Sequence, residues 1–476
     1  MTHNSACTAR RLPRLNLQRF GFLPGCLLLS LFLISACGVR SDETGGGSGD
    51  SLSSNLGNQG TASVNATPGR TAPLSCDIDD MKNWVYANMQ DYYLFYEQVD
   101  QTLNTAAYNT VESLITDLRV APFDTFSYIT EEVEYNAFFN NGETFGFGWL
   151  FHQTDNNEFY FSLVEPGSPL SLAGVQRGDQ LIAINGFDMP DFLQLSSADR
   201  TEILGTGDQV VTLSLTIGKP AGNSSVVSVT KAIYSLDTVL DTQIIERNGI
   251  RIGYLHFYQF LDTSITELAD AFASLAAENV SEIVVDLRYN GGGRIYVANA
   301  LASYLLGTGN TDKAFTTYSF NSKYQLQNES VRFENMVNAL DINRVFVLQS
   351  QSTCSASELI VNGLRPFMDV ITVGNTSCGK PYATAPNAAC GKVMNALEIE
   401  LVNANGVGGY FNGISADCPA SENVAQQLGN TNENLLATAL EYIDTGSCSA
   451  VSARSLAKKQ VVPELELPQW RALGSL

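Results

Sequence analysis

The apolar residues beyond residue 76 follow different periods in successive parts of the chain. Between residues 77 and 120 they recur at spacings of three and four, which predicts two amphipathic helices, with Ile78, Met81, Val85, Met89 and Tyr92 on the first and Val111, Leu114, Ile115 and Leu118 on the second. Between residues 145 and 234, short alternating runs such as FYFSLV, QLIAI and VVTLSLTI are separated by turn signals such as Asn185-Gly186. This second pattern predicts a small β-rich domain.

From about Arg251 the pattern alternates between strands and helices. The expected strands read RIGYLHFY, EIVVDLRY, RVFVLQ and VITVG, and helical segments such as IYVANALASYLL and SASELIVNGL lie between them. Such alternation is typical of a largely parallel sheet covered by helices. The run VMNALEIELV predicts one further strand, and NENLLATALEYI predicts a late helix. The chain is therefore expected to be an α/β protein of several domains.

The two ends of the chain lack these periods. Residues 1–36 combine a basic stretch with a short apolar run, which is typical of a signal peptide. The run ends in ISAC and resembles the bacterial lipoprotein box, in which Cys37 becomes the lipidated first residue; the alternative is an ordinary cleaved signal with an incidental cysteine. Residues 37–75 are rich in Gly, Ser, Asn and Thr and read as a flexible linker, and residues 449–476 form a tail without a clear period.

Charge narrows the possible partners of the protein. The chain has 27 Lys and Arg against 49 Asp and Glu, and four of the basic residues lie in the signal-like segment. So acidic a chain repels phosphate backbones and anionic membrane surfaces, which argues against nucleic-acid binding. A length of 476 residues is too great for one hydrophobic core and favours two or three domains.

The cysteines favour disulfides over a metal site. Six cysteines follow Cys37, an even number that suits an exported, disulfide-bonded chain, although their pairing cannot be derived from the sequence. No C-x-x-C pair occurs, and the only histidines after Cys37 are His152 and His256. A zinc site is therefore not expected.

The stretch QSQSTCSASELI raises the question of whether one of its serines is catalytic. Ser355 and Glu358 have the spacing of a helix capping box, which is one complete explanation for both residues. A serine at a helix N-terminus also lies beside free N–H groups and the positive end of the helix dipole, which suits a developing oxyanion. The local sequence leaves both interpretations open.

A serine nucleophile needs a base, and a lysine is the candidate. His152 and His256 both fall in expected strands and no G-x-S-x-G motif is present, which disfavours a histidine triad. Lys380 lies in NTSCGKPYA, directly after strand VITVG, where open α/β folds place their sites; alternatively it is a solvated loop lysine. The S-x-x-K pattern that begins at Ser377 suggests a penicillin-binding enzyme, but the flanking glycine and proline disfavour the helix which that motif requires.

The segment VVDLRYNGGGR is a buried strand that leads into a turn of three glycines. Gly291 and Gly292 lack a Cβ atom and can direct a backbone N–H toward a ligand. A simple tight turn between strand and helix is the alternative. A phosphate-binding loop is disfavoured because no G-K-[ST] follows.

Taken in order, these segments resemble the C-terminal processing peptidases of serine peptidase family S41. WVYANMQDYYLFYEQVD resembles the family's N-terminal helix, and DTFSYI a segment that precedes its PDZ domain. TFGFGWL with VEPGSPLSLAGVQRGDQLIAING is similar to the PDZ domain itself, and VVDLRYNGGG, CSASE and VGNTSCGKP follow in the family's order. Ser355 and Lys380 are 25 residues apart, which is the family's interval between nucleophile and lysine.

The resemblance implies a domain plan and a catalytic dyad. The plan has an N-terminal helical region at 76–135, a PDZ-like domain at 136–235 and an α/β peptidase domain of the ClpP/crotonase type at 236–448. By the same resemblance Ser355 is the nucleophile, Lys380 the general base and Glu358 an acidic residue beside them. The family often has Gln four residues after its lysine, where this chain has Thr384, so the group that orients Lys380 stays open.

The resemblance also implies two sets of backbone N–H groups that bind substrate. The N–H of Ala356 and that of Gly291 or Gly292 form the oxyanion hole. The loop of the PDZ-like domain at Phe145, Gly146, Phe147 and Gly148 presents N–H groups to the C-terminal carboxylate of a peptide. A disulfide between Cys354 and Cys378, which closely flank the dyad, is a further possibility.

The function expected from the sequence is a serine endopeptidase that binds polypeptides, cleaves them near their C-terminal ends and needs no cofactor. It is expected on the periplasmic side of a bacterial envelope, and Gly38 after the lipidated cysteine favours the outer membrane. Two alternatives stay open: a non-catalytic, PDZ-like peptide-binding lipoprotein, and a Ser-Lys hydrolase of small esters or amides. The substrate and the oligomeric state are not determined by the sequence.

Overall fold

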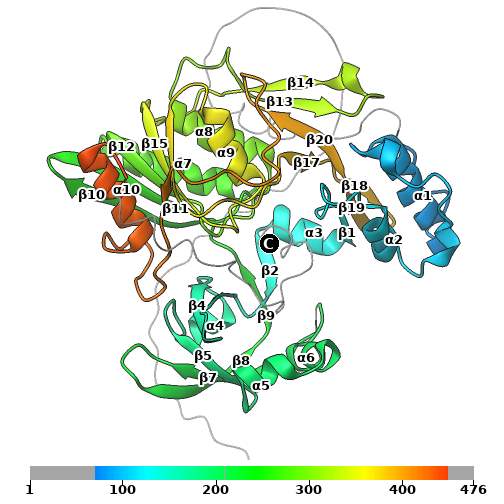
Figure 1. Ribbon diagram of the computed structural model, residues 1–476, viewed down its shortest axis with the longest axis horizontal. Helices are drawn as coiled ribbons and strands as arrows, with labels where there is room; N and C mark the ends of the chain where they lie inside the picture. The colour runs from blue at the N-terminus through cyan, green and yellow to red at the C-terminus, as the bar shows by residue number, and fades with distance from the viewer. Residues whose placement is uncertain (1–69, 208, 449–476) are drawn as a thin grey trace, which may run out of the picture. The chain divides into compact units, whose positions relative to one another are not determined.

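The computed structural model describes residues 70–207 and 209–448, coloured from blue to red in Figure 1. The expected signal peptide, Cys37, nearly all of the linker and the C-terminal tail lie outside the described residues. Three parts are distinguished below: the helical region (76–139), the β-rich unit (143–235) and the α/β unit (236–448). Within this described part of the chain, no helix is long and apolar enough to cross a membrane.

The helical region shares its core with the α/β unit. Its apolar residues pack together with Tyr382, Met394 and Leu397 of the α/β unit, so the region has no separate core. Its strand β1 (Tyr128–Glu131) pairs with β19 (Lys392–Asn395), which in turn pairs with β18 (Asn387–Ala389). The remaining elements are α1 (Ile78–Asp91), η1 (Tyr96–Gln98), η2 (Thr105–Ala107), α2 (Val111–Leu118) and α3 (Glu132–Phe139).

The β-rich unit has the short strands that the alternating pattern predicted. Its main sheet runs in the order β3 (Trp149–Gln153), β4 (Phe159–Val164), β5 (Gln180–Ile184), β7 (Thr212–Gly218) and β8 (Ser224–Thr230). Asn185 and Gly186 have φ values of 51° and 84° and form the tight turn expected from their sequence. The other elements are β2 (Glu143–Gly146), β6 (Phe187–Asp188), β9 (Ala232–Ser235), α4 (Pro169–Leu172), α5 (Met189–Gln194) and α6 (Ser197–Leu204).

The α/β unit contains the largely parallel sheet that the alternation predicted. Its strands run in the order β10 (Val239–Arg247), β11 (Ile250–Phe257), β12 (Glu282–Asp286), β15 (Arg344–Gln349), β16 (Asp369–Gly374) and β21 (Cys418–Pro419), with only β10 antiparallel. Successive residues of a strand face opposite ways, so Ile283 and Val285 pack in one core and Val284 in another. The first core includes residues of α7 (Ser264–Ala277), α8 (Ile295–Leu306) and α9 (Ala356–Leu364), and the second includes α10 (Asn434–Thr445).

The run VMNALEIELV forms two strands rather than the single strand expected. β19 ends at Asn395 and pairs with β1, whereas β20 (Leu397–Val402) joins a separate antiparallel sheet. That sheet runs in the order β14 (Glu329–Arg332), β13 (Ala314–Phe320), β20 and β17 (Tyr382–Thr384), and η3 (Gln325–Gln327) lies between β13 and β14. The prediction of one strand was wrong because distant partners divide the run, and an apolar period does not reveal partners.

All six described cysteines form disulfides, as their even number predicted. The pairs are Cys76–Cys390, Cys354–Cys378 and Cys418–Cys448. Cys76–Cys390 joins the start of the helical region to the turn between β18 and β19. Because this bond closes a loop across 314 residues, it restricts the unfolded chain strongly and stabilises the fold.

Candidate active site

Ser355 lies directly before α9, at the carboxyl end of the central strand β15. Its φ of 55° lies in the left-handed region, which is uncommon for a residue other than glycine. Ser355 is partly exposed, whereas every other residue from 352 to 364 is buried. The helix start therefore presents this one serine to solvent. The Glu358 carboxylate accepts a hydrogen bond from the Ser355 N–H at 3.0 Å, so the expected capping contact is also present.

Gly292 lies against the backbone of Ser355, and its lack of a side chain makes this approach possible. A Cβ atom at Gly292 would lie 2.9 Å from Ser355 Cβ and 3.0 Å from the backbone N of Ala356. The φ of Gly292 is +103°, which a residue with a side chain rarely adopts. The glycine turn after β12 and the start of α9 are thus brought together, as the sequence interpretation required.

Asn290 fixes this glycine turn to the helix that follows Ser355. Its carbonyl accepts from the N–H of Cys354 at 3.1 Å and from the hydroxyl of Ser357 at 2.9 Å. Its side-chain oxygen accepts from the Gly292 N–H at 2.9 Å, and its amide donates to the carbonyl of Phe257 at 3.0 Å. The Gly292 N–H is therefore already bonded.

Two other N–H groups beside Ser355 have no acceptor. Among the residues that the structure describes, neither the N–H of Gly291 nor that of Ala356 makes a hydrogen bond. Gly291 is partly exposed, like Ser355. Of the two glycines considered for an oxyanion hole, Gly291 is thus the one whose N–H is free to bind a ligand.

The buried carboxylate of Glu358 joins the serine segment to the lysine segment. Its Oε2 accepts from the N–H of Ser355 at 3.0 Å and from the N–H of Lys380 at 2.8 Å. Its Oε1 accepts from the N–H of Gly379 at 2.8 Å and from the hydroxyl of Ser377 at 2.5 Å. Burial raises the pKa of Glu358, and these four donors oppose that rise. One side chain thus brings Ser355 and Lys380 together across 25 residues of sequence.

The disulfide between Cys354 and Cys378 joins the same two segments covalently. Its Cα atoms are 5.1 Å apart, and the N–H of Cys378 also donates to the carbonyl of Thr353 at 3.0 Å. The two sulfurs and a Glu358 oxygen lie within 4.8 Å of one another, a spacing that could suit a metal ion. Because the disulfide leaves no thiolate, these atoms do not form a metal site.

The surroundings of Lys380 favour the uncharged form of its amine more than those of an ion-paired lysine would. Burial lowers its pKa to about 8, although Asp124 and Glu358 act in the opposite direction. No carboxylate among the described residues lies within 4.0 Å of Nζ. At that pKa about a tenth of the amine is uncharged at pH 7, far more than for an ordinary lysine, and the uncharged form is the one that can accept a proton.

The aromatic and acidic neighbours of Lys380 come from the helical region and were not assigned to the site from the sequence. The ring of Phe126 lies under the amine, with 5.1 Å between Nζ and the ring centroid. Asp124 is buried close by and interacts electrostatically with Lys380. Both residues belong to DTFSYI, where the sequence pointed only to a resemblance. Their distance of more than 250 residues from Lys380 hides the contact from any local pattern.

The two histidines take no part in this arrangement. His152 lies in β3 and His256 in β11, as expected for strand residues. The His256 side chain is buried, and burial lowers its pKa to about 4. Neither side chain makes a hydrogen bond to Ser355 in the described part of the chain.

The loop expected to bind a peptide carboxylate follows β2. Gly148 has a φ of +83°, and a Cβ atom there would lie 2.1 Å from the side chain of Ser168. The carbonyls of Phe147 and Gly148 accept from Leu170 and Glu165, while their own N–H groups have no acceptor among the described residues. Phe145 and Gly146 differ from these because they pair with β9. The loop leads into β3, which is an edge strand of its sheet.

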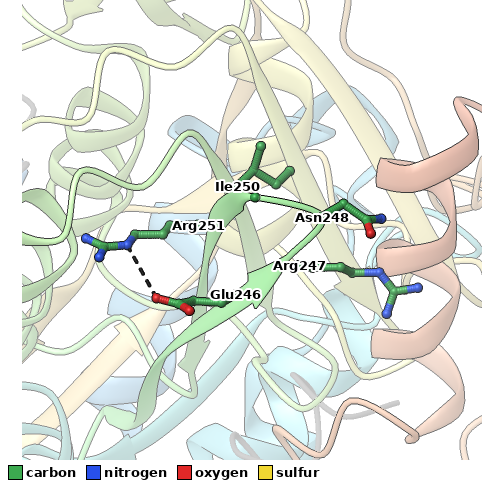
Figure 2. Close-up of a pocket in the computed structure, with 6 residues that line it drawn as sticks. Glu246, Arg247, Asn248, Ile250 and Arg251 are labelled. Atoms are coloured by element: carbon green, nitrogen blue, oxygen red, sulfur yellow. Dashed lines mark ion pairs between the residues drawn. The ribbon is translucent and has the colours of Figure 1, made fainter.

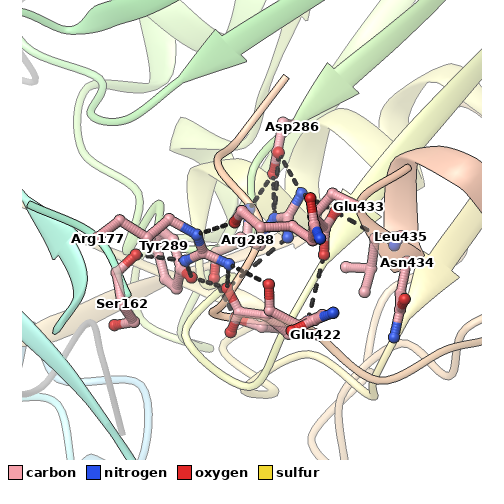
Figure 3. Close-up of polar contacts among 12 residues, drawn as sticks. Ser162, Arg177, Asp286, Arg288, Tyr289, Glu422, Glu433, Asn434 and Leu435 are labelled. Atoms are coloured by element: carbon pink, nitrogen blue, oxygen red, sulfur yellow. Dashed lines mark hydrogen bonds and ion pairs between the residues drawn. The ribbon is translucent and has the colours of Figure 1, made fainter. Parts of the chain in front are cut away.

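A buried ionic network connects the β-rich unit to the strand end that carries the glycine turn (Figure 3). Arg177 of the β-rich unit donates to the hydroxyl of Tyr289 at 2.7 Å and pairs with Glu422 at 2.8 Å. Arg288, beside Tyr289, pairs with Asp286 at 2.7 Å and with Glu433 at 2.9 Å. Tyr289 directly precedes Asn290, so the network holds the segment from which the glycine turn begins.

A shallow hollow at the hairpin between β10 and β11 is unrelated to this site. It is lined by residues 246–251, including an ion pair between Arg251 and Glu246 at 3.6 Å (Figure 2). Both partners of this pair are well exposed to solvent, so it contributes little to stability. None of these residues contacts Ser355 or Lys380.

Two family models and several curated proteins match parts of the chain. Peptidase family S41 matches residues 251–418, and the peptidase S41 N-terminal domain matches residues 80–128. A carboxyl-terminal-processing protease of Picosynechococcus sp. is 29% identical over 216 residues, covering 45% of this chain and 49% of that protein. The carboxy-terminal processing protease CtpA of Bacillus subtilis is 22% identical over 330 residues, covering 69% of this chain and 66% of that protein. The chain thus spans from about half to two thirds of the length of these curated relatives.

A solved structure supports the fold. An S41 protease structure from Bacteroides fragilis superposes with a TM-score of 0.61 at 23% identity, covering 76% of this chain and 97% of that one. The chain is thus similar to the serine-type peptidases of family S41 over residues 80–128 and 251–418, and it shares the fold of the solved S41 protease structure.

Proposed function

We propose that the protein is a serine endopeptidase that cleaves polypeptides near their C-terminal ends through a Ser355–Lys380 dyad. The observation that carries this proposal is the single carboxylate oxygen of Glu358 that accepts from the N–H groups of both residues. The α/β unit is interpreted as a peptidase domain of the ClpP/crotonase type. Its site lies at the carboxyl ends of parallel strands, where such folds place their ligands.

The chemistry proceeds in two halves through an acyl-enzyme. The uncharged amine of Lys380 takes the proton of the Ser355 hydroxyl as Oγ attacks the scissile carbonyl carbon. The ammonium of Lys380 then gives this proton to the leaving nitrogen, the C–N bond breaks, and an ester to Ser355 remains. In the second half a water gives its proton to Lys380 and attacks the ester, and the serine regains its proton as the new carboxylate leaves. No cofactor is required for any of these steps.

The negative oxygen of each tetrahedral intermediate is stabilised by the N–H groups of Gly291 and Ala356. Support for this pair comes from the fact that neither N–H has an acceptor among the described residues, whereas the Gly292 N–H already donates to Asn290. Donors that are fixed before the reaction stabilise developing charge without reorganising. The Asn290 contacts described above provide this fixation.

The β-rich unit is interpreted as a PDZ-like domain that selects the substrate end. The free N–H groups of Phe147 and Gly148 suit a peptide carboxylate, and the edge strand β3 can pair with the extended peptide beside it. The substrate is therefore a polypeptide with a free C-terminus, which is bound by the β-rich unit and cleaved in the α/β unit.

This selection is tested with one peptide sequence made with a free carboxylate and with a C-terminal amide. We expect cleavage of both, with a KM about 5- to 50-fold lower for the carboxylate form, because the amide loses charge-assisted hydrogen bonds. Cleavage rates and products are measured by mass spectrometry. Equal kcat/KM for the two forms contradicts recognition of the C-terminus. Turnover of a short p-nitrophenyl ester with no cleavage of either peptide favours a small-molecule hydrolase instead.

We further propose that Cys37 is lipidated and holds the enzyme on the periplasmic side of the outer membrane. Support comes from the ISAC sequence alone, which lies outside the described residues. A Cys37→Ala variant is expected in the soluble fraction of cells, with the wild type and the matched Cys26→Ala control in the outer-membrane fraction. Membrane retention of Cys37→Ala would rule out this anchor.

A further inference from the structure

The amine of Lys380 has few contacts that could hold it toward Ser355. In the described part of the chain, Nζ makes no hydrogen bond and has no carboxylate within 4.0 Å. Thr384, which occupies the position four residues later, lies in β17 and makes no side-chain hydrogen bond to Lys380. The backbone of Lys380 is fixed by Glu358, but its four-carbon side chain needs a further constraint.

The aromatic ring of Phe126 is the contact that remains. Lys380 Nζ lies over this ring, 5.1 Å from its centroid, which is within the range of a cation–π interaction. A ring face attracts the charged amine and also gives the aliphatic stem an apolar surface to pack on. The ring therefore restricts where the amine can lie in both of its protonation states.

Phe126 is itself held firmly by Asp124. The Oδ1 atom of Asp124 accepts from the N–H groups of Phe126 and Ser127, both at 2.8 Å. The Oδ2 atom accepts from the hydroxyls of Tyr93 and Ser127, at 2.7 and 2.6 Å. A buried carboxylate with four donors fixes the backbone at Phe126, and the Phe126 side chain is partly buried against the core that the helical region shares with the α/β unit.

We propose that Phe126 is a positioning residue, whose ring holds the amine of Lys380 in reach of Ser355 in place of the side chain four residues after the lysine. The role of Lys380 as the general base rests on the proposed function, but the ring's effect on the amine does not. The helical region thereby supplies part of the active site rather than serving only as a packing partner of the α/β unit.

The charges around Lys380 fix the sign of the expected effect. Asp124 from the helical region and Glu358 from α9 both favour the ammonium form. Asp124 also interacts electrostatically with Arg119 and Tyr93, and Glu358 with Tyr410. The ring of Phe126 adds to the stabilisation of the ammonium. Removing the ring while keeping the site apolar therefore lowers the pKa of Lys380 below about 8.

The test compares Phe126→Leu, which keeps apolar bulk, with Phe126→Tyr, which keeps the ring. Phe123→Leu is the matched control, because Phe123 directly precedes the same segment but stacks on Phe95 and meets Phe411 edge-to-face instead of contacting Lys380. For the wild type, kcat/KM is expected to rise with pH to a midpoint near 8 as Lys380 loses its proton. For Phe126→Leu we expect a midpoint about 0.5 to 1 pH unit lower and a plateau about 3- to 30-fold lower. For Phe126→Tyr and Phe123→Leu we expect a plateau of kcat/KM within about twofold of the wild-type value.

A second measurement follows Lys380 without using catalysis. The protein is labelled with ¹³C-lysine, and the NMR signal of Lys380 Cε is assigned by its absence from the spectrum of Lys380→Met. The chemical shift of this signal is then followed as a function of pH. A lower midpoint in Phe126→Leu alone supports the inference, even if no peptide is cleaved and the proposed function fails. An unchanged midpoint in Phe126→Leu, or an equal shift in Phe123→Leu, overturns it.

Discussion

Ser355→Ala and Lys380→Ala are each expected to cleave peptides at least about 10⁴-fold more slowly than the wild type. Ser355→Ala lacks the oxygen that forms the acyl-enzyme. Lys380→Ala lacks the amine that accepts and returns the proton, and no other base takes its place, since the Glu358 carboxylate already accepts four hydrogen bonds. The double variant is expected to be no slower than either single variant, because the two residues act as a unit.

The matched controls for these substitutions are Ser330→Ala and Lys313→Ala. Ser330 lies exposed on β14, and the Lys313 amine donates to Asn310 and lies over the ring of Phe367. Both controls should retain wild-type kcat/KM, which is measured on the same peptide between pH 6 and 10. If either dyad variant turns over peptide within tenfold of its control, the residue concerned is not catalytic. Intact fold is verified for each variant by its thermal unfolding midpoint.

Glu358→Gln is expected to lower kcat/KM about 10²- to 10³-fold and to destabilise the protein by about 2–5 kcal/mol. The four donors to Glu358 arrive two on each oxygen. Glutamine replaces one of these oxygens with an NH₂ group, which faces donors instead of accepting from them. Two buried donors are left unpaired, and the lysine segment is released from the serine segment.

Chemical denaturation and peptide cleavage together measure this effect. Glu329→Gln on the exposed strand β14 is the control and should change neither quantity. The disulfide between Cys354 and Cys378 keeps the two segments connected in Glu358→Gln, so a folded but slow enzyme is expected rather than an unfolded chain. Retention of more than a third of the wild-type kcat/KM would show that Glu358 does not position the dyad.

The elements with a clear local period could be predicted closely from the sequence. FYFSLV and QLIAI coincide with β4 and β5 at both ends, and NENLLATALEYI covers all of α10 except its last two residues. The pattern succeeds there because each element buries one face or both faces against a core, and burial selects the apolar positions. It failed at VMNALEIELV because burial alone does not say which distant strand lies alongside.

The residues of the proposed active site likewise divide into those that the sequence indicated and those that only the structure revealed. Ser355 and Lys380 stood out by their place at strand ends and by their interval, and Gly291 and Gly292 by their lack of side chains. The choice of Gly291 over Gly292 depends on where the Asn290 side chain points, which no spacing reveals. The pairing of six cysteines likewise has many solutions in the sequence and one in the structure.

The sequence by itself determined the order of the three parts, the parallel sheet and the two residues proposed for the dyad, because hydrophobic period and turn chemistry act over a few neighbouring residues. Only the tertiary structure decided what surrounds that dyad. Glu358 reaches 22 residues ahead to bind the backbone of Lys380, and Phe126 lies beneath the same lysine from a segment more than 250 residues away. Contacts of this kind arise when separate elements pack into shared cores, and the packing of distant elements leaves no period in the chain.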